Sequence, residues 1–218
     1  MPSLTRPSAD RVAGLLAAVN AAAPTHPPGG LDGPGDRAAC RGPLRTGHKT
    51  DLGRGDRAFA AARAVLRRWG QFPEWAAVHG PGGTLPPPPV EDDAVCVVAR
   101  GGGVWWANPC RIYEVIDTPD CFSVAYTTLP GHVCRGEERF RLTRGPEGRV
   151  WYDVRADSEL AHPLAKLAGP LVRRKQCEFA RDSLAVLRKA VRTAGVTKPD
   201  SAADLPRVPA GLTAAAGY

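Results

Sequence analysis

Short runs of alternating hydrophobic and polar residues, separated by glycine and proline, dominate the middle of the chain. Alternation with a period of two places every second side chain on one face, which is typical of antiparallel strands. A first strand is predicted over Leu44 to Leu52 and ends at the Gly53-Arg54-Gly55 turn. Six further strands are predicted, at Trp75 to Val78, Ala94 to Ala99, Cys110 to Ile116, Phe122 to Leu129, Cys134 to Thr143 and Arg149 to Ala156.

A helix and a linker are predicted before the first strand. The helix covers Ser8 to Ala23, with Ser8 or Asp10 as its N-cap, and stops at Pro24. The segment from Pro24 to Gly35 is so rich in proline and glycine that we interpret it as linker or irregular coil. The predicted organisation is therefore an N-terminal helix and linker (1–43), a folded domain (44–195) and a disordered tail (196–218).

A second helix is predicted directly after the first strand. Asp56 is its expected cap, and Gly70 its expected end. Its apolar positions recur at helical spacing, at Phe59, Ala62, Leu66 and Trp69.

A third, long helix is predicted over His162 to Thr193, after the last strand. Gly169-Pro170 should bend it or split it in two. One apolar stripe runs along this helix, formed by Leu164, Leu167, Leu171, Leu184, Leu187 and Val191. The order of strand, helix, six strands and long helix predicts an α+β fold, in which a curved antiparallel sheet is covered by the C-terminal helix. If the sheet curls around that helix, a cavity for a small apolar ligand is left between them.

Composition and charge exclude several classes of protein. The 218 residues are 43% hydrophobic, which is too apolar for a disordered chain. No apolar run is long enough to cross a membrane, and no signal peptide is recognisable, so we expect a cytoplasmic protein. The net charge of +7 comes mainly from arginine without aromatic interleaving, so we expect no nucleic-acid partner and treat binding through the arginine-rich helix surfaces as the weakest hypothesis.

Cysteine spacing and known motifs narrow the chemistry further. The six cysteines are far apart and form no zinc-ligand pattern, so we expect free thiols and no metal site. The sequence contains no GxGxxG, GxxxxGK[ST], HExxH or GxSxG motif. Nucleotide-dependent, zinc-protease and serine-hydrolase chemistry is therefore not expected, and we predict no cofactor.

Short motifs such as Asn108-Pro109-Cys110-Arg111, Thr128-Leu129-Pro130-Gly131-His132 and Arg135-Gly136-Glu137-Glu138-Arg139-Phe140 lie between residues 44 and 192. Six such motifs together resemble a bacterial and plant family known only as a domain of unknown function. That family is similar to the helix-grip superfamily, which includes START lipid-binding domains and aromatic polyketide cyclases. The resemblance implies a helix-grip fold of about seven strands with a ligand cavity, but no particular reaction. The motifs are Leu52-Gly53-Arg54-Gly55 with Phe59, Ala62 and Trp69; Asn108-Pro109-Cys110-Arg111; Thr128-Leu129-Pro130-Gly131-His132; Arg135-Gly136-Glu137-Glu138-Arg139-Phe140; Val150-Trp151-Tyr152-Asp153; and Phe179-Ala180-Arg181-Asp182-Ser183.

Two positions depart from the pattern of that family. Cys134 stands where an acidic or small residue is expected, and Thr127 stands where glycine is common. Both are expected near the mouth of the cavity, so the choice of ligand could be particular to this protein.

Glu138 is the first candidate for acid/base chemistry. In the strand from Cys134, the even positions form the apolar face, so Glu138 should point into the core or cavity. A buried carboxyl group needs a partner or a proton, which makes it a candidate general acid or base. The alternative is a structural ion pair with an inward arginine such as Arg111 or Arg155.

His132 and Tyr126 complete the candidate catalytic group. His132 lies two residues before Cys134, which could indicate a thiolate pair, although a turn histidine that hydrogen-bonds the backbone is the simpler interpretation. Tyr126 lies on an apolar strand face, where its hydroxyl could donate to a ligand carbonyl or fill the core with one partner. The candidate substrate-binding residues are Arg111, Tyr113, Trp106, Tyr152, Cys134 and Phe140.

Adjacent and alternating residues lead to two further expectations. Trp105 and Trp106 cannot both face inward, so one should pack and the other line an entrance. Asp153 and Asp157 are expected on a solvent-exposed strand face, where they would form salt bridges.

Two functions from different classes fit these features. The first is a cofactor-free enzyme that binds a polyketide-like or aromatic molecule and catalyses cyclisation, dehydration or isomerisation, possibly in secondary metabolism. The alternative is a non-catalytic carrier or sensor of a hydrophobic small molecule or lipid. In either case a hydrophobic small molecule is the expected partner of a monomer or homodimer.

Overall fold

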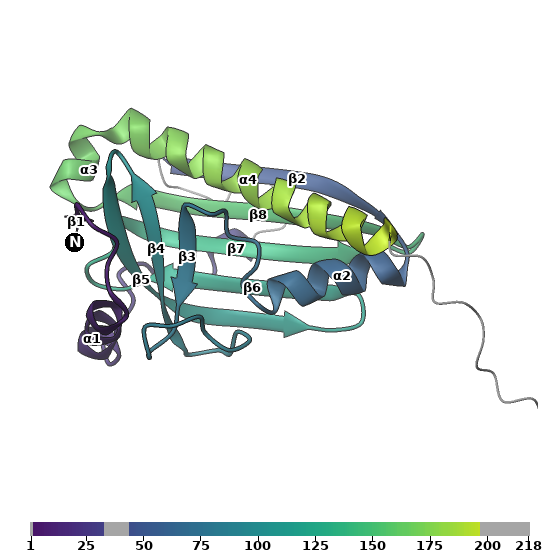
Figure 1. Cartoon of the computed structure of the whole chain (residues 1–218), viewed down its shortest axis with the longest axis horizontal. Helices are drawn as coiled ribbons and strands as arrows, with labels where there is room; N and C mark the ends of the chain where they lie inside the picture. The colour runs from purple at the N-terminus through teal and green to yellow at the C-terminus, as the bar shows by residue number, and fades with distance from the viewer. Residues whose placement is uncertain (1, 33–43, 197–218) are drawn as a thin grey trace, which may run out of the picture.

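The computed structural model describes residues 2–32 and 44–196 of the chain. An eight-stranded antiparallel sheet forms its framework, with the order β2-β8-β7-β6-β5-β4-β3 and the short β1 paired to β5. Figure 1 shows the sheet bending strongly, so that β3, β4 and β5 stand across the direction of β6, β7 and β8. The strands are β1 Pro2–Ser3, β2 Leu44–Arg54, β3 Ala76–His79, β4 Ala94–Gly101, β5 Val104–Asp117, β6 Cys121–Thr128, β7 Cys134–Arg144 and β8 Arg149–Leu160.

The predicted strand series is confirmed, and β5 and β8 extend furthest beyond the predicted bounds. β5 begins at Val104 instead of Cys110, because Pro109 stays within the ladder opposite Cys96 instead of breaking it. β8 continues to Leu160, where it still pairs with Cys134. The longer β5 matters for the site, because its first half forms one wall of the cavity.

The helices are α1 Ala9–Val19, α2 Asp56–Leu66, α3 Pro163–Leu167 and α4 Gly169–Val196, and η1 Gly30–Asp32 is a 3₁₀ turn. Ser8 caps α1 as expected, but α1 ends before Ala23. The cap of α2 is Gly55, and Asp56 is already the first helical residue. The predicted split of the C-terminal helix is confirmed, since α4 starts at Gly169.

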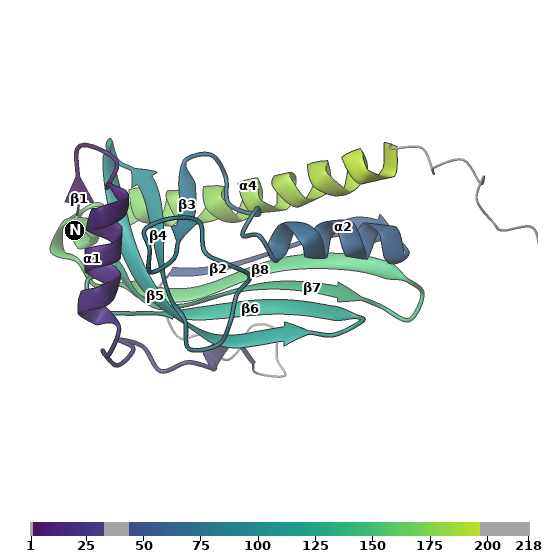
Figure 2. The ribbon, with the colours of Figure 1, turned by 60° about the horizontal axis from the view of Figure 1, so that its bottom comes forward.

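The main core lies on the concave face of the sheet, between the strands and the pair α2 and α4. Phe59, Ala62 and Leu66 of α2 and Leu184 and Leu187 of α4 pack in one cluster against the sheet. Figure 2 shows both helices on the same side of the sheet, with α2 beside the C-terminal half of α4. This confirms the α+β helix-grip prediction, and it leaves the N-terminal half of α4 without α2 beside it (Figure 2).

The predicted stripe of α4 is only partly buried. Leu184 and Leu187 are in the core, whereas Leu167 and Leu171 are 87% and 44% exposed. Leu164 belongs to α3, but its side chain lies outside the described residues. Leu184 and Leu187, in the C-terminal part of the stripe, therefore cover the sheet, whereas Leu167 and Leu171 remain exposed.

The N-terminal segment packs on the opposite face of the sheet. Val12, Leu16 and Val19 of α1 form a second apolar cluster with residues of β4 and β5. The stretch interpreted as linker also contacts the sheet as far as Asp32: the backbone N–H of Gly29 donates to Glu137 at 3.0 Å, and Leu31 is buried. Residues 33–43 and 197–218, which include Cys40 and the predicted tail, lie outside the described residues.

Asp153 and Asp157 were expected on a solvent-exposed face with salt bridges, but the convex face of β7 and β8 is covered around Asp157, and for that residue the expectation is wrong. Arg139, Glu137 and Asp157 are buried there. Nε of Arg139 lies 3.4 Å from Glu114 Oε1, and its Nη1 donates to the carbonyl oxygen of Leu31 at 3.2 Å. The N-terminal segment covers these charges, and they are consequently held in ion pairs and hydrogen bonds.

No helix in the described ranges combines the length and the apolar composition that a membrane crossing requires.

Candidate functional site

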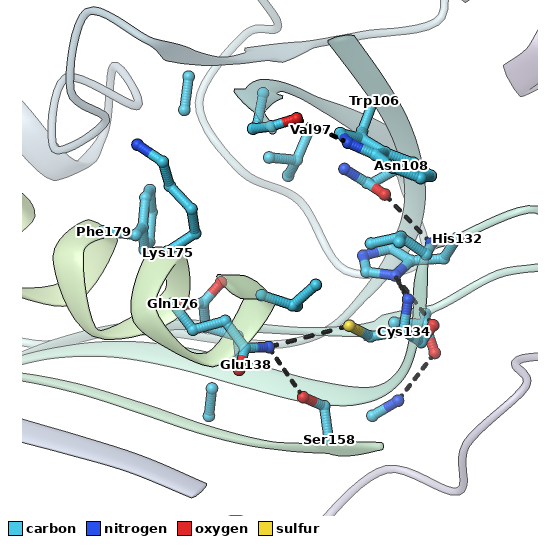
Figure 3. A pocket seen from close by; sticks show the side chains of 18 of the residues that line it. Val97, Trp106, Asn108, His132, Cys134, Glu138, Ser158, Lys175, Gln176 and Phe179 are labelled. Atoms are coloured by element: carbon cyan, nitrogen blue, oxygen red, sulfur yellow. Dashed lines mark hydrogen bonds between the residues drawn. The ribbon is translucent and has the colours of Figure 1, made fainter. Parts of the chain in front are cut away.

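A cavity of about 450 Å³ lies between the concave face of the sheet and the N-terminal half of α4. Its wall is mainly apolar and includes Trp75, Val97, Trp106 and Phe179. The space exists because α2 covers only the other half of the sheet, while β3, β4 and β5 curl up beside α4 (Figure 1). Figure 3 shows that polar side chains enter this space from both the strands and the helix. An apolar cavity with a few converging polar groups is the usual form of a small-molecule site.

Glu138 and Tyr126 form the central polar pair of the cavity. They are directly opposite each other on β7 and β6, and both line the cavity. The Tyr126 hydroxyl donates a hydrogen bond to Oε2 of Glu138. Strand alternation predicted the inward direction of both side chains, and their cross-strand pairing follows from the register.

Burial sets the protonation of this pair. It raises the pKa of Glu138 from 4.5 to about 7, although the hydrogen bond from Tyr126 acts in the opposite direction. Burial and the neighbouring Glu138 raise the pKa of Tyr126 well above its usual value. Near neutral pH Glu138 therefore exists as both acid and carboxylate, beside a tyrosine that keeps its proton.

The ion-pair alternative for Glu138 does not occur with the arginines that were considered. Arg111 donates to the carbonyl oxygens of Asp92, at 2.6 Å, and of Asn20 on the other face of the sheet. Arg155 lies 3.6 Å from Asp153. Within the described part of the chain, Tyr126 is the hydrogen-bond partner of the Glu138 carboxyl group.

His132 lines the cavity but forms no catalytic pair with Cys134. Its Nδ1 lies 2.9 Å from both the amide nitrogen and the carbonyl oxygen of Cys134, as the turn interpretation expected. Burial lowers the pKa of His132 to about 4 and raises the pKa of Cys134 to about 11. Both side chains are consequently neutral near pH 7, which excludes a thiolate–imidazolium nucleophile.

Gln176 of α4 is a polar residue of the site that the sequence analysis missed. Its Nε2 donates to the Ser158 hydroxyl at 3.1 Å and lies 3.9 Å from Sγ of Cys134. Its Oε1 is buried and has no hydrogen-bond partner among the described residues. Figure 3 shows how this side chain reaches from the helix to the two strands. A ligand with a hydrogen-bond donor would satisfy the free oxygen.

Asn108 on β5 was quoted in a motif but was not assigned to the site. Its Oδ1 accepts a hydrogen bond from the backbone N–H of Val133 at 3.2 Å, which fixes the loop that carries His132. Since a backbone N–H can only donate, the amide orientation of Asn108 is determined, and its NH₂ group is left to donate elsewhere. Asn108 lines the cavity, so this donor is available to a ligand carbonyl.

The two adjacent tryptophans separate as expected. Trp106 lines the cavity, and its indole N–H donates to the Gly101 carbonyl at 3.3 Å. Trp105 packs on the other face with the α1 cluster, under the guanidinium of Arg6.

Lys175 lies over the Trp75 ring at 4.6 Å and is the charged residue that α4 contributes to the cavity lining.

Two predicted binding residues, Arg111 and Tyr113, are on the wrong face of the sheet. A β-bulge between Ile112 and Glu114 makes Tyr113 an extra residue and changes the alternation along β5. The Tyr113 hydroxyl donates to Oε2 of Glu137 at 2.6 Å, on the convex face. Arg111 and Tyr113 alternate regularly with the inward-facing Ile112, and the bulge changes the facing only of the residues after Tyr113, such as the inward Val115. A single alternation along β5 therefore could not assign these side chains correctly.

Two others, Tyr152 and Phe140, face inward but belong to the core. Tyr152 is fully buried, with its hydroxyl 2.8 Å from Ser183 Oγ of α4. Phe140 packs against the rings of Phe72 and Phe179. Neither lines the cavity, because the C-terminal half of α4 and α2 fill the space above them.

Of the two positions that depart from the family pattern, only Cys134 belongs to the site. Thr127 is buried on the other face, and its hydroxyl donates to the His26 carbonyl at 2.8 Å. The predicted residues that the fold brings together are thus Glu138, Tyr126, His132, Cys134 and Trp106. No cluster of three or more metal-ligating side chains occurs in the described ranges.

Comparison with solved structures agrees with the fold. A crystal structure of a hypothetical protein from Helicobacter pylori superposes with a TM-score of 0.55 at 11% identity, covering 77% of this chain and 96% of that one. A START superfamily protein from Mycobacterium smegmatis matches with a TM-score of 0.46 at 13% identity, covering 68% of this chain and 97% of that one.

Sequence comparison gives the family. A UPF0548 protein of Deinococcus radiodurans is 33% identical over 155 residues, which is 68% of this chain and 77% of the relative. The model of the domain of unknown function DUF1990 matches residues 37–186, more than half of the chain. The expected family resemblance is confirmed, and the chain belongs to the DUF1990 family.

Proposed function

We propose that this protein is a cofactor-free enzyme that uses Glu138 and Tyr126 to move a proton on a small, largely apolar carbonyl compound. The observation that carries the proposal is the hydrogen-bonded Glu138–Tyr126 pair inside an apolar cavity, with the pKa of Glu138 raised to about 7. A carboxyl group with that pKa can accept and return a proton near neutral pH. A polyketide-like or aromatic ketone is the kind of molecule that fits the mainly apolar wall.

The reaction begins with Glu138 as a carboxylate. It removes a proton from the carbon next to the ligand carbonyl, and the electron pair of that C–H bond moves into the carbonyl to give an enolate. The Tyr126 hydroxyl, freed from Glu138 by the protonation of that group, donates to the enolate oxygen. Because the pKa of Tyr126 is raised well above its usual value, tyrosine stays a donor throughout.

Three outcomes are open to the enolate, and each is balanced in protons. Glu138 can return its proton to another carbon, which is an isomerisation. It can protonate a leaving hydroxyl group, which is a dehydration. The enolate carbon can also attack a second carbonyl of the same molecule, and Glu138 then protonates the new alkoxide, which is a cyclisation. Asn108 and Gln176 would orient the ligand through the NH₂ of the first and the free Oε1 of the second.

The first experiment asks for proton abstraction itself. The bicyclic aromatic ketone α-tetralone is incubated with the protein in D₂O, and loss of its α-proton NMR signal is followed. We expect the wild-type protein to accelerate exchange and Glu138→Gln to abolish the acceleration. The matched control is Glu137→Gln, the neighbour on the opposite face of β7. Equal exchange rates with wild-type protein and Glu138→Gln would refute the role of Glu138.

The second candidate is a carrier or sensor that holds a hydrophobic molecule without changing it. It is favoured by the mainly apolar wall of the cavity and by His132 and Cys134, which both remain uncharged near neutral pH. Native mass spectrometry of the protein as expressed would detect a co-purified small molecule. A carrier releases that molecule unchanged, and Glu138→Gln then retains it, whereas an enzyme gives a product of altered mass or isomeric form.

Other expectations from the sequence remain predictions. They are a cytoplasmic protein that acts in secondary metabolism, the absence of a cofactor and of a nucleic-acid partner, a monomer or homodimer, and residues 44–195 as the ligand-binding domain. Size-exclusion chromatography with light scattering would test the oligomeric state.

A further inference from the structure

Two exposed leucines lie at the edge of the cavity. Leu167 ends α3 and Leu171 lies in the first turn of α4, and they are 87% and 44% exposed. Leu171 also lines the cavity, so the exposed apolar surface continues into the interior. Across the opening lies the β4–β5 turn, where Gly102 is so close that an added Cβ would be 3.5 Å from Leu171 Cδ2. Exposed apolar side chains beside a cavity opening commonly mark an interaction site.

The charge around these leucines is positive. Residues 163–177 contain Lys166, Arg173, Arg174 and Lys175 but no Asp or Glu. The β4–β5 turn, Gly102 and Gly103, adds no acidic residue. Lys166, Arg173 and Arg174 are exposed. The first acidic residue along α4 is Glu178, which pairs with Lys175 at 3.0 Å.

We propose that this surface, formed by α3, the first two turns of α4 and the β4–β5 turn, docks the protein on an anionic lipid bilayer. The leucines would enter the boundary of the acyl chains, while the basic side chains contact anionic headgroups. The cavity opening would then face the membrane, and a hydrophobic ligand could pass between bilayer and cavity without crossing water. Leu167, which is 87% exposed, lies near the exposed basic side chains of Lys166, Arg173 and Arg174, and an anionic bilayer matches both the apolar and the basic feature.

Docking does not depend on the chemistry of Glu138, because that group lies inside the cavity. The broken helix supports the arrangement, since the break before Gly169 separates α3 from α4 and lets Leu167 project away from the core. At the other end of α4, Leu184 and Leu187 are buried against the sheet. The docking surface is thus confined to the open end of the cavity.

The test is flotation of the full-length protein with vesicles of phosphatidylcholine, alone or with phosphatidylserine as a minor component. We expect binding to the mixed vesicles only, and loss of binding at high salt. Arg173→Ser with Arg174→Ser should weaken binding about tenfold or more. The matched control is Lys189→Ser with Arg192→Ser, which removes the same charge from exposed positions at the far end of α4.

Leu167→Asn tests insertion, with Leu85→Asn as control at a leucine that is 65% exposed in the loop before β4. Only Leu167→Asn should reduce binding. The proposal is overturned if the protein binds neither type of vesicle. It is also overturned if the arginine double variant and the control double variant weaken binding equally, or if Leu167→Asn binds like the wild type. A concentration-dependent dimer that Leu167→Asn abolishes would identify a second copy as the occupant and also overturn it. Glu138→Gln should bind vesicles normally, so failure of the catalytic proposal is distinguishable.

Discussion

Tyr126 and Glu138 face each other across β6 and β7, and the tyrosine hydroxyl donates to Oε2 of the glutamate inside the cavity. The pKa of Glu138 is set by two opposing effects: burial raises it, and the hydrogen bond from Tyr126 lowers it. The pair therefore combines a carboxyl group that titrates near neutral pH with a permanent donor.

Stability should fall as the pH rises through the titration of Glu138. Its folded-state pKa of about 7 lies above the ordinary value of 4.5, so the folded protein binds the extra proton in this interval. The contribution is fully present below pH 4.5 and is lost as the pH passes about 7, by roughly 3 kcal/mol at most. Urea unfolding of wild type and Glu138→Gln at a series of values between about pH 5 and about pH 8 measures this loss of stability.

His132 contributes to the pH dependence of stability with the opposite sign, and its contribution must be separated from that of Glu138. Its folded-state pKa of about 4 lies below the ordinary 6.5, so its burial as a neutral ring favours the folded state increasingly as the pH rises from about 4 to 6.5. Above pH 6.5 the remaining decline belongs to Glu138 alone. A wild-type profile that Glu138→Gln leaves unchanged in that interval contradicts the assignment.

Tyr126→Phe should raise the pKa of Glu138 further. The substitution removes the hydroxyl that stabilises the carboxylate and leaves the ring in place. NMR titration of the labelled glutamate carboxyl carbon would show the shift, and proton exchange of α-tetralone should reach its plateau at a higher pH. Tyr113→Phe is the control, since its hydroxyl bonds Glu137 on the other face. An unchanged titration in Tyr126→Phe would argue against the hydrogen bond.

Gln176→Leu should separate ligand binding from stability. The substitution removes the unpartnered buried Oε1 together with the donor to Ser158, so the free energy of unfolding should change by only about 1 kcal/mol. Affinity for a ligand that donates to Oε1 should fall about tenfold. Calorimetric titration with the co-purified molecule measures this loss. Unaltered affinity would mean that the amide does not contact the ligand.

Arg139→Met should destabilise the protein strongly although it lies far from the cavity. Arg139 is 2% exposed, and its removal takes the buried guanidinium away from the Leu31 carbonyl and from Glu114, which keeps Ser123 and Arg141 as partners. A loss of about 3 kcal/mol is expected, the lower end for breaking a buried pair. Arg135→Met, on the same strand and face but with a side chain 53% exposed, should change stability by no more than about 1 kcal/mol. Similar unfolding curves for the two variants would show that the covered face contributes little.

Gly136→Ala tests the close approach of β7 and β8. A Cβ at this position would overlap the backbone of Asp157 and Ser158, whereas a Cβ at Gly47 of β2 would meet nothing within 4 Å. The first substitution should cost about 3 kcal/mol or more, and Gly47→Ala should be nearly neutral. Thermal unfolding measures the stability of both variants. A Gly136→Ala protein as stable as the wild type would be inconsistent with the pairing of Gly136 and Ser158 between β7 and β8.

Much of the fold was predictable because each strand has one apolar face. Alternation placed Glu138 inward, and the helical stripe identified α4 as the cover. Alternation could not detect the bulge in β5, after which Val115 faces inward although Arg111 and Tyr113, four and two positions earlier, face outward. Nor could it show that the segment around Leu31 covers Arg139, since that contact joins residues about a hundred positions apart.

The sequence by itself determined which side chains face the interior of the sheet, because that depends on local periodicity. Only the tertiary structure decided which inward residues line a cavity and which fill the core. That division follows from where α2 ends its cover of the sheet: Tyr152 and Phe140 lie beneath the packed helices, while Glu138 lies beyond them. Gln176 joined the site for the same reason, since no spacing along α4 shows which strand its side chain will meet.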